Sequence, residues 1–206
     1  MKQNFKGVTL TKTKVKNNIL SSWNQTSEED RKDWYKEARQ FCTKLGTETH
    51  TCTIAVCGVL AALSPIKTWK ENKKITEDFI RDGKCGHFKS LQDKAKRIVE
   101  YSHSTAYESN TEKENSSNII SILNGNKIRS FFVNIAFPQE YNEVTIDRHA
   151  LSVALGYKVK DDDMRGITDN QYNFFVECYK TASNKVGVSP LIMQSATWVW
   201  YRKQKK

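Results

Sequence analysis

The stretch from Ile119 to Gly156 reads IISILNGNKIRSFFVNIAFPQEYNEVTIDRHALSVALG and contains two apolar helical patterns, over 128–136 and 148–155. Lys127 stands at the entrance to the first pattern, and Asp147, 20 residues later, stands at the entrance to the second. We expect the amine and the carboxylate to face each other across a cleft. Such a pair suits nucleophilic attack on a sugar.

The composition describes a folded protein with a strongly basic balance. Of the 206 residues, 38% are hydrophobic and 11% aromatic, and the formal net charge is +10. This hydrophobic content excludes a disordered chain. The positive charge favours a polyanionic partner, because each Lys or Arg set against a phosphate releases a counterion. We expect DNA, duplex or single-stranded, although solubility alone explains part of the charge.

Several classes are excluded by what the sequence lacks. No apolar run approaches the roughly 20 residues that span a bilayer, and the N-terminus lacks an apolar signal core. We therefore expect a cytoplasmic protein without a membrane partner, and a monomer, although the sequence does not fix the oligomeric state. The five cysteines contain no C-x-x-C pair, which predicts reduced thiols and no metal site. Without a Gly-rich phosphate loop, no small-molecule cofactor is expected.

Helical signals recur along most of the chain. Residues 1–26 are rich in Lys, Asn and Thr and are expected to form an irregular N-terminal arm. Ser27 with the acidic residues after it predicts the start of a helix that runs to about Lys44 and ends at Gly46. Thr51 to Leu63 is apolar on nearly every side, which predicts a helix at the centre of the core.

The fold class predicted for the chain is all-α. Residues 27–206 are expected to form a helical domain of two lobes around a central cleft. The stretch 103–117 has low hydrophobicity and is predicted to be a surface loop or the join between the lobes.

With this helix order, the chain resembles the helix-hairpin-helix DNA glycosylase superfamily, which has the endonuclease III-like fold. The matching motifs are Gly125-Asn126-Lys127 for the hairpin and Ile146-Asp147-Arg148-His149-Ala150-Leu151-Ser152-Val153 for the catalytic helix. Upstream, residues 59–65 look like the family's central helix and the loop after it, and residues 94–98 look like the helix before the hairpin. The resemblance runs from about residue 50 to 200. Within the superfamily, the chain is similar to a divergent subgroup found in viral genomes.

The chain departs from the family pattern at two places. The usual hairpin Leu-Pro-Gly-Val-Gly is here Leu123-Asn124-Gly125-Asn126, with one glycine, so fewer backbone N–H groups can hold a duplex phosphate. The C-terminal iron–sulfur cysteines are absent, as in several branches of the family.

The resemblance implies the catalytic roles. Lys127 matches the amine nucleophile that attacks the anomeric carbon and forms a Schiff base, and Asp147 matches the carboxylate that stabilises positive charge on deoxyribose. Each residue also has a structural interpretation. Lys127 can be a solvated lysine in a first helical turn, and Asp147 can be an ordinary helix N-cap.

The remaining candidates are expected to contact DNA. Arg129 and Arg148 are predicted phosphate ligands, and His149 is a candidate for contact with substrate or phosphate, against the alternative of a packed imidazole. Gly125 would allow close approach of the backbone, and the helix that begins at Asn126 would point its free N–H groups at a phosphate.

The loop after the central helix supplies a candidate wedge or base-stacking platform. Its residues are Ser64, Pro65 and Trp69. An enzyme that acts on a base must take it out of the stack and fill the space that it leaves. The alternative for Trp69 is that it closes the core.

Three functions remain open from the sequence. The first is a DNA glycosylase, with or without lyase activity, that excises a damaged or modified base. The second keeps the fold but modifies an activated thymine or other pyrimidine, as some members of the superfamily are thought to do. The third is a non-catalytic nucleic-acid-binding protein.

Overall fold

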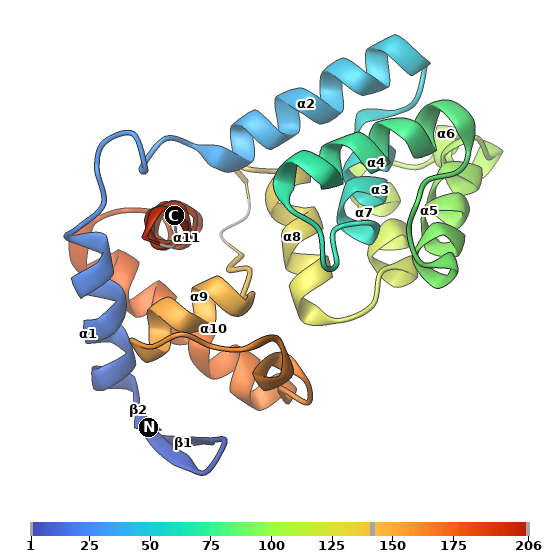
Figure 1. The fold of residues 1–206 in the computed structure, drawn as a ribbon. Coiled ribbons are helices and arrows are strands. Elements are labelled where there is room, and N and C mark those ends of the chain that lie inside the picture. Colours follow the sequence, from blue (N-terminus) through green and yellow to red (C-terminus); the bar gives the residue numbers. More distant parts are fainter. Residues whose placement is uncertain (1, 141–142, 205–206) are drawn as a thin grey trace. The chain divides into compact units, whose positions relative to one another are not determined.

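The computed structural model describes residues 2–140 and 143–204 (Figure 1). Helices make up most of this part of the chain, and its one sheet is a hairpin of two strands. The all-α prediction is therefore confirmed. The chain forms two compact units: unit 1 contains residues 1–35 and 139–206, and unit 2 contains residues 36–138. None of the described helices is long and apolar enough to cross a membrane.

Unit 2 is organised around helix α3 (Thr53–Ala62), which is buried from Ile54 to Ala62. It packs against α5 and α8 and also contacts α4 and α7. The buried central helix expected over 51–63 is therefore present. The other helices of the unit are α2 (Trp34–Thr49), whose first two residues belong to unit 1, α4 (Trp69–Asp82), α5 (Lys89–Ser102), α6 (Thr105–Ser109), α7 (Glu112–Ile122) and α8 (Asn126–Ala136).

The helix expected from Ser27 to Gly46 is displaced along the chain. Ser27 and Asp30 cap each other around an isolated turn, and α2 begins only at Trp34. Gly46 lies inside α2 rather than at its end. A Cβ atom there would lie 2.5 Å from the backbone oxygen of Thr51, whose N–H donates to the Gly46 carbonyl at 2.9 Å. The glycine is needed because the chain folds back onto the helix at this point.

Replacement of Gly46 by alanine should therefore destabilise the protein. The new methyl group would meet backbone rather than a flexible side chain, and overpacking of this kind costs about 1–3 kcal/mol, more than the gain of up to about 1 kcal/mol in helix propensity. We expect a lower urea midpoint for Gly46→Ala. Gly86→Ala is the control, because nothing lies within 4 Å of its Cβ position. Equal midpoints for the two variants would contradict the packing argument.

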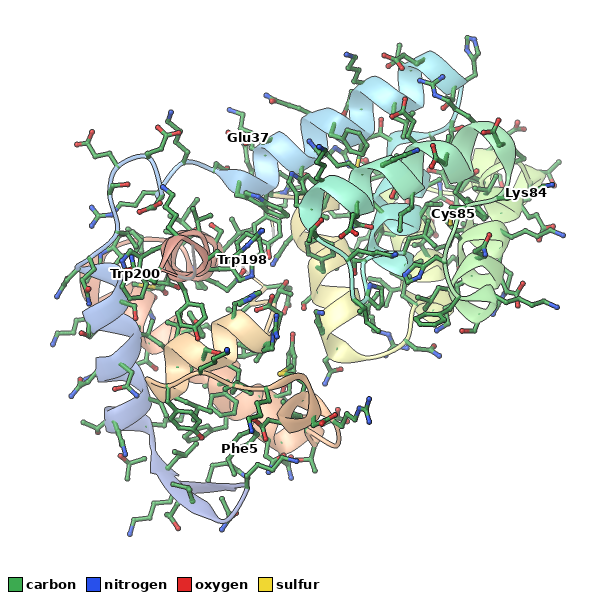
Figure 2. The ribbon with its side chains drawn as sticks, viewed as in Figure 1. Phe5, Glu37, Lys84, Cys85, Trp198 and Trp200 are labelled. Carbon is green, nitrogen blue, oxygen red and sulfur yellow. The ribbon has the colours of Figure 1, made fainter. Side chains whose placement is uncertain are left out.

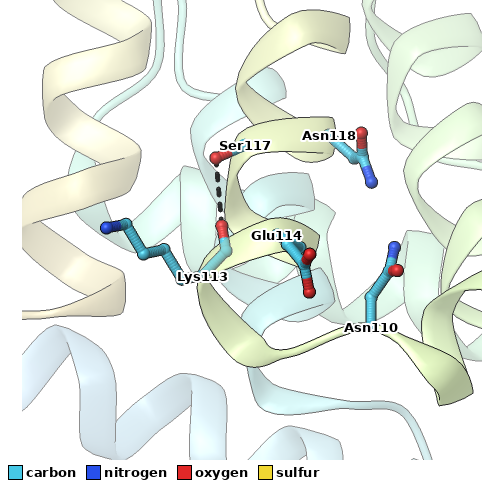
Figure 3. A pocket seen from close by; sticks show the side chains of 5 residues that line it. All are labelled: Asn110, Lys113, Glu114, Ser117 and Asn118. Atoms are coloured by element: carbon cyan, nitrogen blue, oxygen red, sulfur yellow. Dashed lines mark hydrogen bonds between the residues drawn. The ribbon is translucent and has the colours of Figure 1, made fainter.

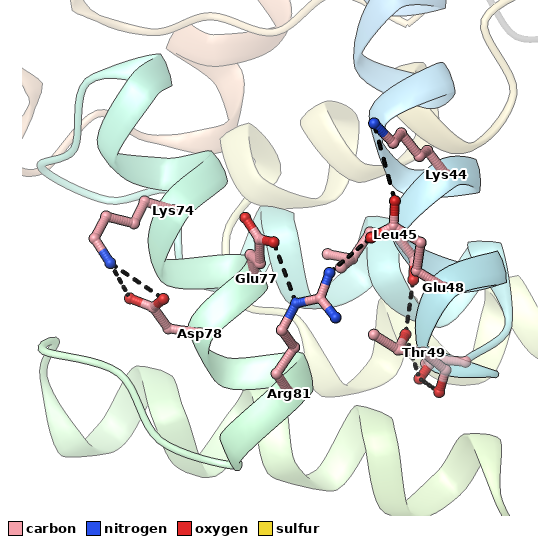
Figure 4. Close-up of polar contacts among 9 residues, drawn as sticks. Lys44, Leu45, Glu48, Thr49, Lys74, Glu77, Asp78 and Arg81 are labelled. Carbon is pink, nitrogen blue, oxygen red and sulfur yellow. Dashed lines mark hydrogen bonds and ion pairs between the residues drawn. The ribbon is translucent and has the colours of Figure 1, made fainter.

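Ion pairs join α4 to α2 on the surface of unit 2 (Figure 4). The Arg81 guanidinium lies 2.6 Å from Glu48 of α2 and 3.1 Å from Glu77 of its own helix. All three side chains are about half exposed, so the pairs contribute little to stability. A capping box between Thr68 and Glu71 fixes the start of α4.

The N-terminal segment of unit 1 is ordered, which corrects the expectation of an irregular arm over 1–26. Strands β1 (Lys2–Phe5) and β2 (Val8–Thr11) form an antiparallel hairpin, and α1 (Lys12–Trp23) follows directly. The two turn residues have positive φ, +49° at Lys6 and +80° at Gly7, as a tight hairpin turn requires. Phe5 anchors the hairpin by packing edge-on against Phe175, with ring centroids 5.7 Å apart.

The rest of unit 1 packs around the C-terminal helices. Helix α10 contacts α1, α9 and α11, and α11 contacts α1 and α9. These elements are α9 (Arg148–Leu155), the short 3-10 helix η1 (Asp161–Met164), α10 (Asp169–Val186) and α11 (Pro190–Lys203).

The stretch 103–117 is also corrected. It forms α6 and the first half of α7 inside unit 2, rather than a loop or a join. A capping box between Thr111 and Glu114 starts α7 despite the low hydrophobicity of the segment. The divisions between the units fall instead after Tyr35 and after Pro138.

Candidate functional site

Asp147 is the N-cap residue of α9, and both of its carboxylate oxygens are engaged. Oδ1 accepts a hydrogen bond from the backbone N–H of Ala150 at 2.8 Å, and Oδ2 accepts one from the indole N–H of Trp198 at 2.8 Å. The side chain remains 19% exposed. Asp147 is thus a helix cap, as expected, and also a fixed carboxylate with access to solvent.

Two tyrosines of α10 hold the backbone on either side of Asp147. The Tyr172 hydroxyl donates to the Val144 carbonyl at 3.0 Å and accepts from the Ile146 N–H at 3.1 Å. The Tyr179 hydroxyl donates to the Ala150 carbonyl at 2.9 Å. Burial raises the pKa of Tyr179 far above its usual value, so this phenol remains a hydrogen-bond donor. The start of α9 is therefore fixed against the core of unit 1.

His149 lies beside the same carboxylate. Its Nδ1 is 3.5 Å from Asp147 Oδ2, and its Nε2 is 3.5 Å from a guanidinium nitrogen of Arg148. The ring packs between Trp198 and Tyr201, with centroids 6.0 Å and 5.9 Å away. The structure therefore brings together the predicted residues Asp147, Arg148 and His149, and His149 is largely a packed imidazole.

In unit 2, Gly125 is the N-cap of α8 and has φ +80°, a conformation that strains any other residue. Asn126 and Lys127 are the first two residues of the helix, and both are half-buried. Arg129 is exposed, but its Nε donates to the Leu123 carbonyl at 2.9 Å, which ties the side chain to the segment between α7 and α8. Lys127 belongs to unit 2 and Asp147 to unit 1. Their pairing across a cleft stays a prediction.

Two of the three side chains expected as a wedge, those of Ser64 and Trp69, contact other residues of unit 2. The Ser64 hydroxyl donates to the Ala61 carbonyl at 2.9 Å, and Trp69 packs edge-on against Phe41 with centroids 6.3 Å apart. Between them, Ile66 is 84% exposed and has φ +61°. Positive φ is a strained conformation for a β-branched residue. The outward side chain of this loop is therefore Ile66.

A second loop supports the Ile66 loop. His87 Nε2 lies 3.1 Å from the Pro65 carbonyl and joins the segment before α5 to the segment after α3. Phe88, which packs beside the His87 ring at 5.2 Å, is 59% exposed. We call Ile66 and Phe88 the apolar tips of unit 2.

A family model matches residues 1–205. The chain belongs to the DUF7178 family, a family of unknown function. No curated protein and no solved structure gives a significant match to it. Residue roles therefore have to be argued from the geometry of the sites.

Sequence reasoning did not find Trp198, Tyr172, Tyr179, Ile66 and Phe88. The three aromatic residues of unit 1 lie 25 or more positions after Asp147, and no sequence motif connects them to it. For Ile66 a signal was present, because it stands between Pro65 and a helix N-cap, where the chain turns.

A metal site or a pocket elsewhere in the described part of the chain would be a further candidate. Residues 2–140 and 143–204 contain no group of three His, Cys, Asp or Glu side chains placed to hold a metal ion. A shallow polar hollow of about 370 Å³ lies on α7 and is lined by none of the predicted site residues (Figure 3). Its lining residues are Asn110, Lys113, Glu114, Ser117 and Asn118.

Proposed function

We propose that the protein is a DNA glycosylase that acts on a damaged or modified base, with Asp147 as its catalytic carboxylate. The observation that carries the proposal is the Asp147 side chain, which is partly exposed and held at both oxygens at the start of α9. A carboxylate that has only a capping role needs the Ala150 contact alone. The second donor, Trp198, fixes the direction in which the charge points.

The chemistry of base release suits such a carboxylate. Cleavage of a glycosidic bond places positive charge on the sugar, and a fixed negative charge nearby stabilises the transition state without reorganisation. The N-terminus of α9 favours the ionised form of Asp147, because the helix dipole is positive there. Lys127 is the candidate nucleophile, and attack by its amine would give an imine with the sugar.

The unit 2 residues supply binding functions in this proposal. The N-cap of α8 is a glycine, which places no side chain of its own over the first turn, and such a helix start suits a DNA phosphate. Arg129 and Lys127 add positive charge beside it. The apolar tips Ile66 and Phe88 would fill the space left by an extruded base, flanked by Lys67 and Lys89 as phosphate ligands.

The role of the tips predicts an effect of Ile66→Asn. Asparagine tolerates positive φ, so the free energy of unfolding should stay the same or rise, while base release from duplex DNA should fall by about tenfold or more. The loss should be smaller for single-stranded DNA, where less stacking has to be broken. Val186→Asn, at another exposed apolar position, is the control. Equal losses on both DNA forms would count against a wedge.

The proposed activity is tested by a strand-nicking assay. Duplex oligonucleotides that carry uracil, 5-hydroxyuracil or 5-hydroxymethyluracil are incubated with the protein, with and without later alkali. Alkali-labile sites support glycosylase activity, and cleavage without alkali supports a lyase step. Intact DNA of increased mass would instead favour transfer of a group to the base. Binding without either change would favour a non-catalytic protein.

A further inference from the structure

The hydrogen bond from Trp198 to Asp147 is not needed to cap helix α9. The Trp198 indole N–H lies 2.8 Å from Asp147 Oδ2, although the cap of α9 is already completed by Oδ1 and the Ala150 N–H. The two residues are 51 positions apart, on α11 and at the start of α9. An indole N–H can donate a hydrogen bond but neither accepts nor releases a proton at ordinary pH.

The Trp198 ring is itself held on several sides. The Arg202 guanidinium lies 4.7 Å from its centroid and the Trp34 ring lies 5.5 Å from it. The His149 ring meets it edge-on at 6.0 Å. Trp200, two positions along α11, lies on a different side of that helix (Figure 2). The indole can therefore present its N–H in one direction only.

We infer that Trp198 is a positioning residue that orients the Asp147 carboxylate toward the substrate and keeps it ionised. The inference rests on the proposed function, because it takes Asp147 as the catalytic group. A charged acceptor strengthens the hydrogen bond, and the bond in turn favours the charged form. Asp147 then acts through its negative charge, and proton acceptance from water is disfavoured.

Other titratable or charged groups near the carboxylate have to be considered in any test. His149 approaches Oδ2 at 3.5 Å from α9, with Arg148 behind it. Tyr179 faces Asp147 from α10, and Arg202 lies over the Trp198 ring on α11.

The first measurement follows the Asp147 carboxyl carbon by NMR as a function of pH. Trp198→Phe keeps an aromatic ring for Trp34 and Arg202 but removes the donor, so the pKa of Asp147 should rise relative to the wild type. Trp200→Phe is the matched control and should leave the titration unchanged. An unchanged titration in Trp198→Phe would overturn the inference.

The second measurement does not depend on the folding of a Trp198 variant. In the wild-type protein, one of the five indole N–H resonances should shift as Asp147 takes up a proton. This shift should disappear in Asp147→Asn, which keeps the helix cap. If no indole resonance follows the aspartate, the hydrogen bond has no role in its ionisation and the inference fails.

Activity separates this inference from the proposed function. On the oligonucleotide that the wild type cleaves, Trp198→Phe should lose about tenfold in base release, with the acid limb of its pH profile moved to higher pH. Full activity in Trp198→Phe would refute the positioning role and leave the glycosylase proposal intact. If the wild type acts on none of the oligonucleotides, the glycosylase proposal fails, and the two NMR titrations decide whether Trp198 controls the carboxylate.

Discussion

Asp147→Asn should reduce base release by about 10²–10³-fold. Asparagine is as good an N-cap as aspartate, so the bond to the Ala150 N–H and the start of α9 should survive. The change removes the negative charge that faces the developing cation on the sugar, and loss of one such preorganised group costs about 2.7–4 kcal/mol in the barrier. The measurement is the single-turnover rate of base release, scored as alkali-labile sites.

Thermal unfolding of Asp147→Asn shows whether the cap is kept. Asp162→Asn is a suitable control, because that carboxylate is 82% exposed and pairs only loosely with Arg165, at 3.5 Å. It should leave both the rate and the melting temperature unchanged. A fully active Asp147→Asn protein would mean that Asp147 is a structural cap and that the resemblance to glycosylases is one of fold alone.

The features that depend only on residues close together in the sequence could be predicted. Asp147 stands directly before an apolar pattern of helical period, and the structure has it capping α9 through Ala150. Helix α3 was predicted as buried because it has no polar face, and a helix without one must be surrounded by other elements. In both cases the information lies within a single helix and the residues next to it.

The contacts that define the geometry of the site are not local. Trp198 reaches Asp147 from 51 residues away, and Tyr172 reaches Val144 from 28 residues away. A tryptophan in an apolar helix has the same sequence pattern whether its N–H faces a carboxylate or a carbonyl. Only the packing of α9, α10 and α11 decides which acceptor it meets.

The loop after α3 shows a different limit. Its position was predicted, with Ser64, Pro65 and Trp69 as the candidates for a wedge or a base-stacking platform. Ser64 turns back to the Ala61 carbonyl, and the positive φ at Ile66 directs that side chain outward. The turn after Pro65 is visible in the sequence, but the side chain that points outward from it depends on the backbone conformation.

Lys127→Ala should abolish strand cleavage while reducing base release much less. An amine nucleophile forms an imine with the sugar, and elimination from that imine breaks the backbone, whereas base release needs only the Asp147 charge and a water molecule. Sodium borohydride should trap the wild-type protein on DNA and fail to trap Lys127→Ala. Lys113→Ala is the matched control, because Lys113 is likewise the second residue of its helix, α7, and is exposed. If Lys127→Ala still forms the trapped complex, another amine is the nucleophile; if the wild type leaves only intact abasic sites, the enzyme is monofunctional and Lys127 serves to bind phosphate.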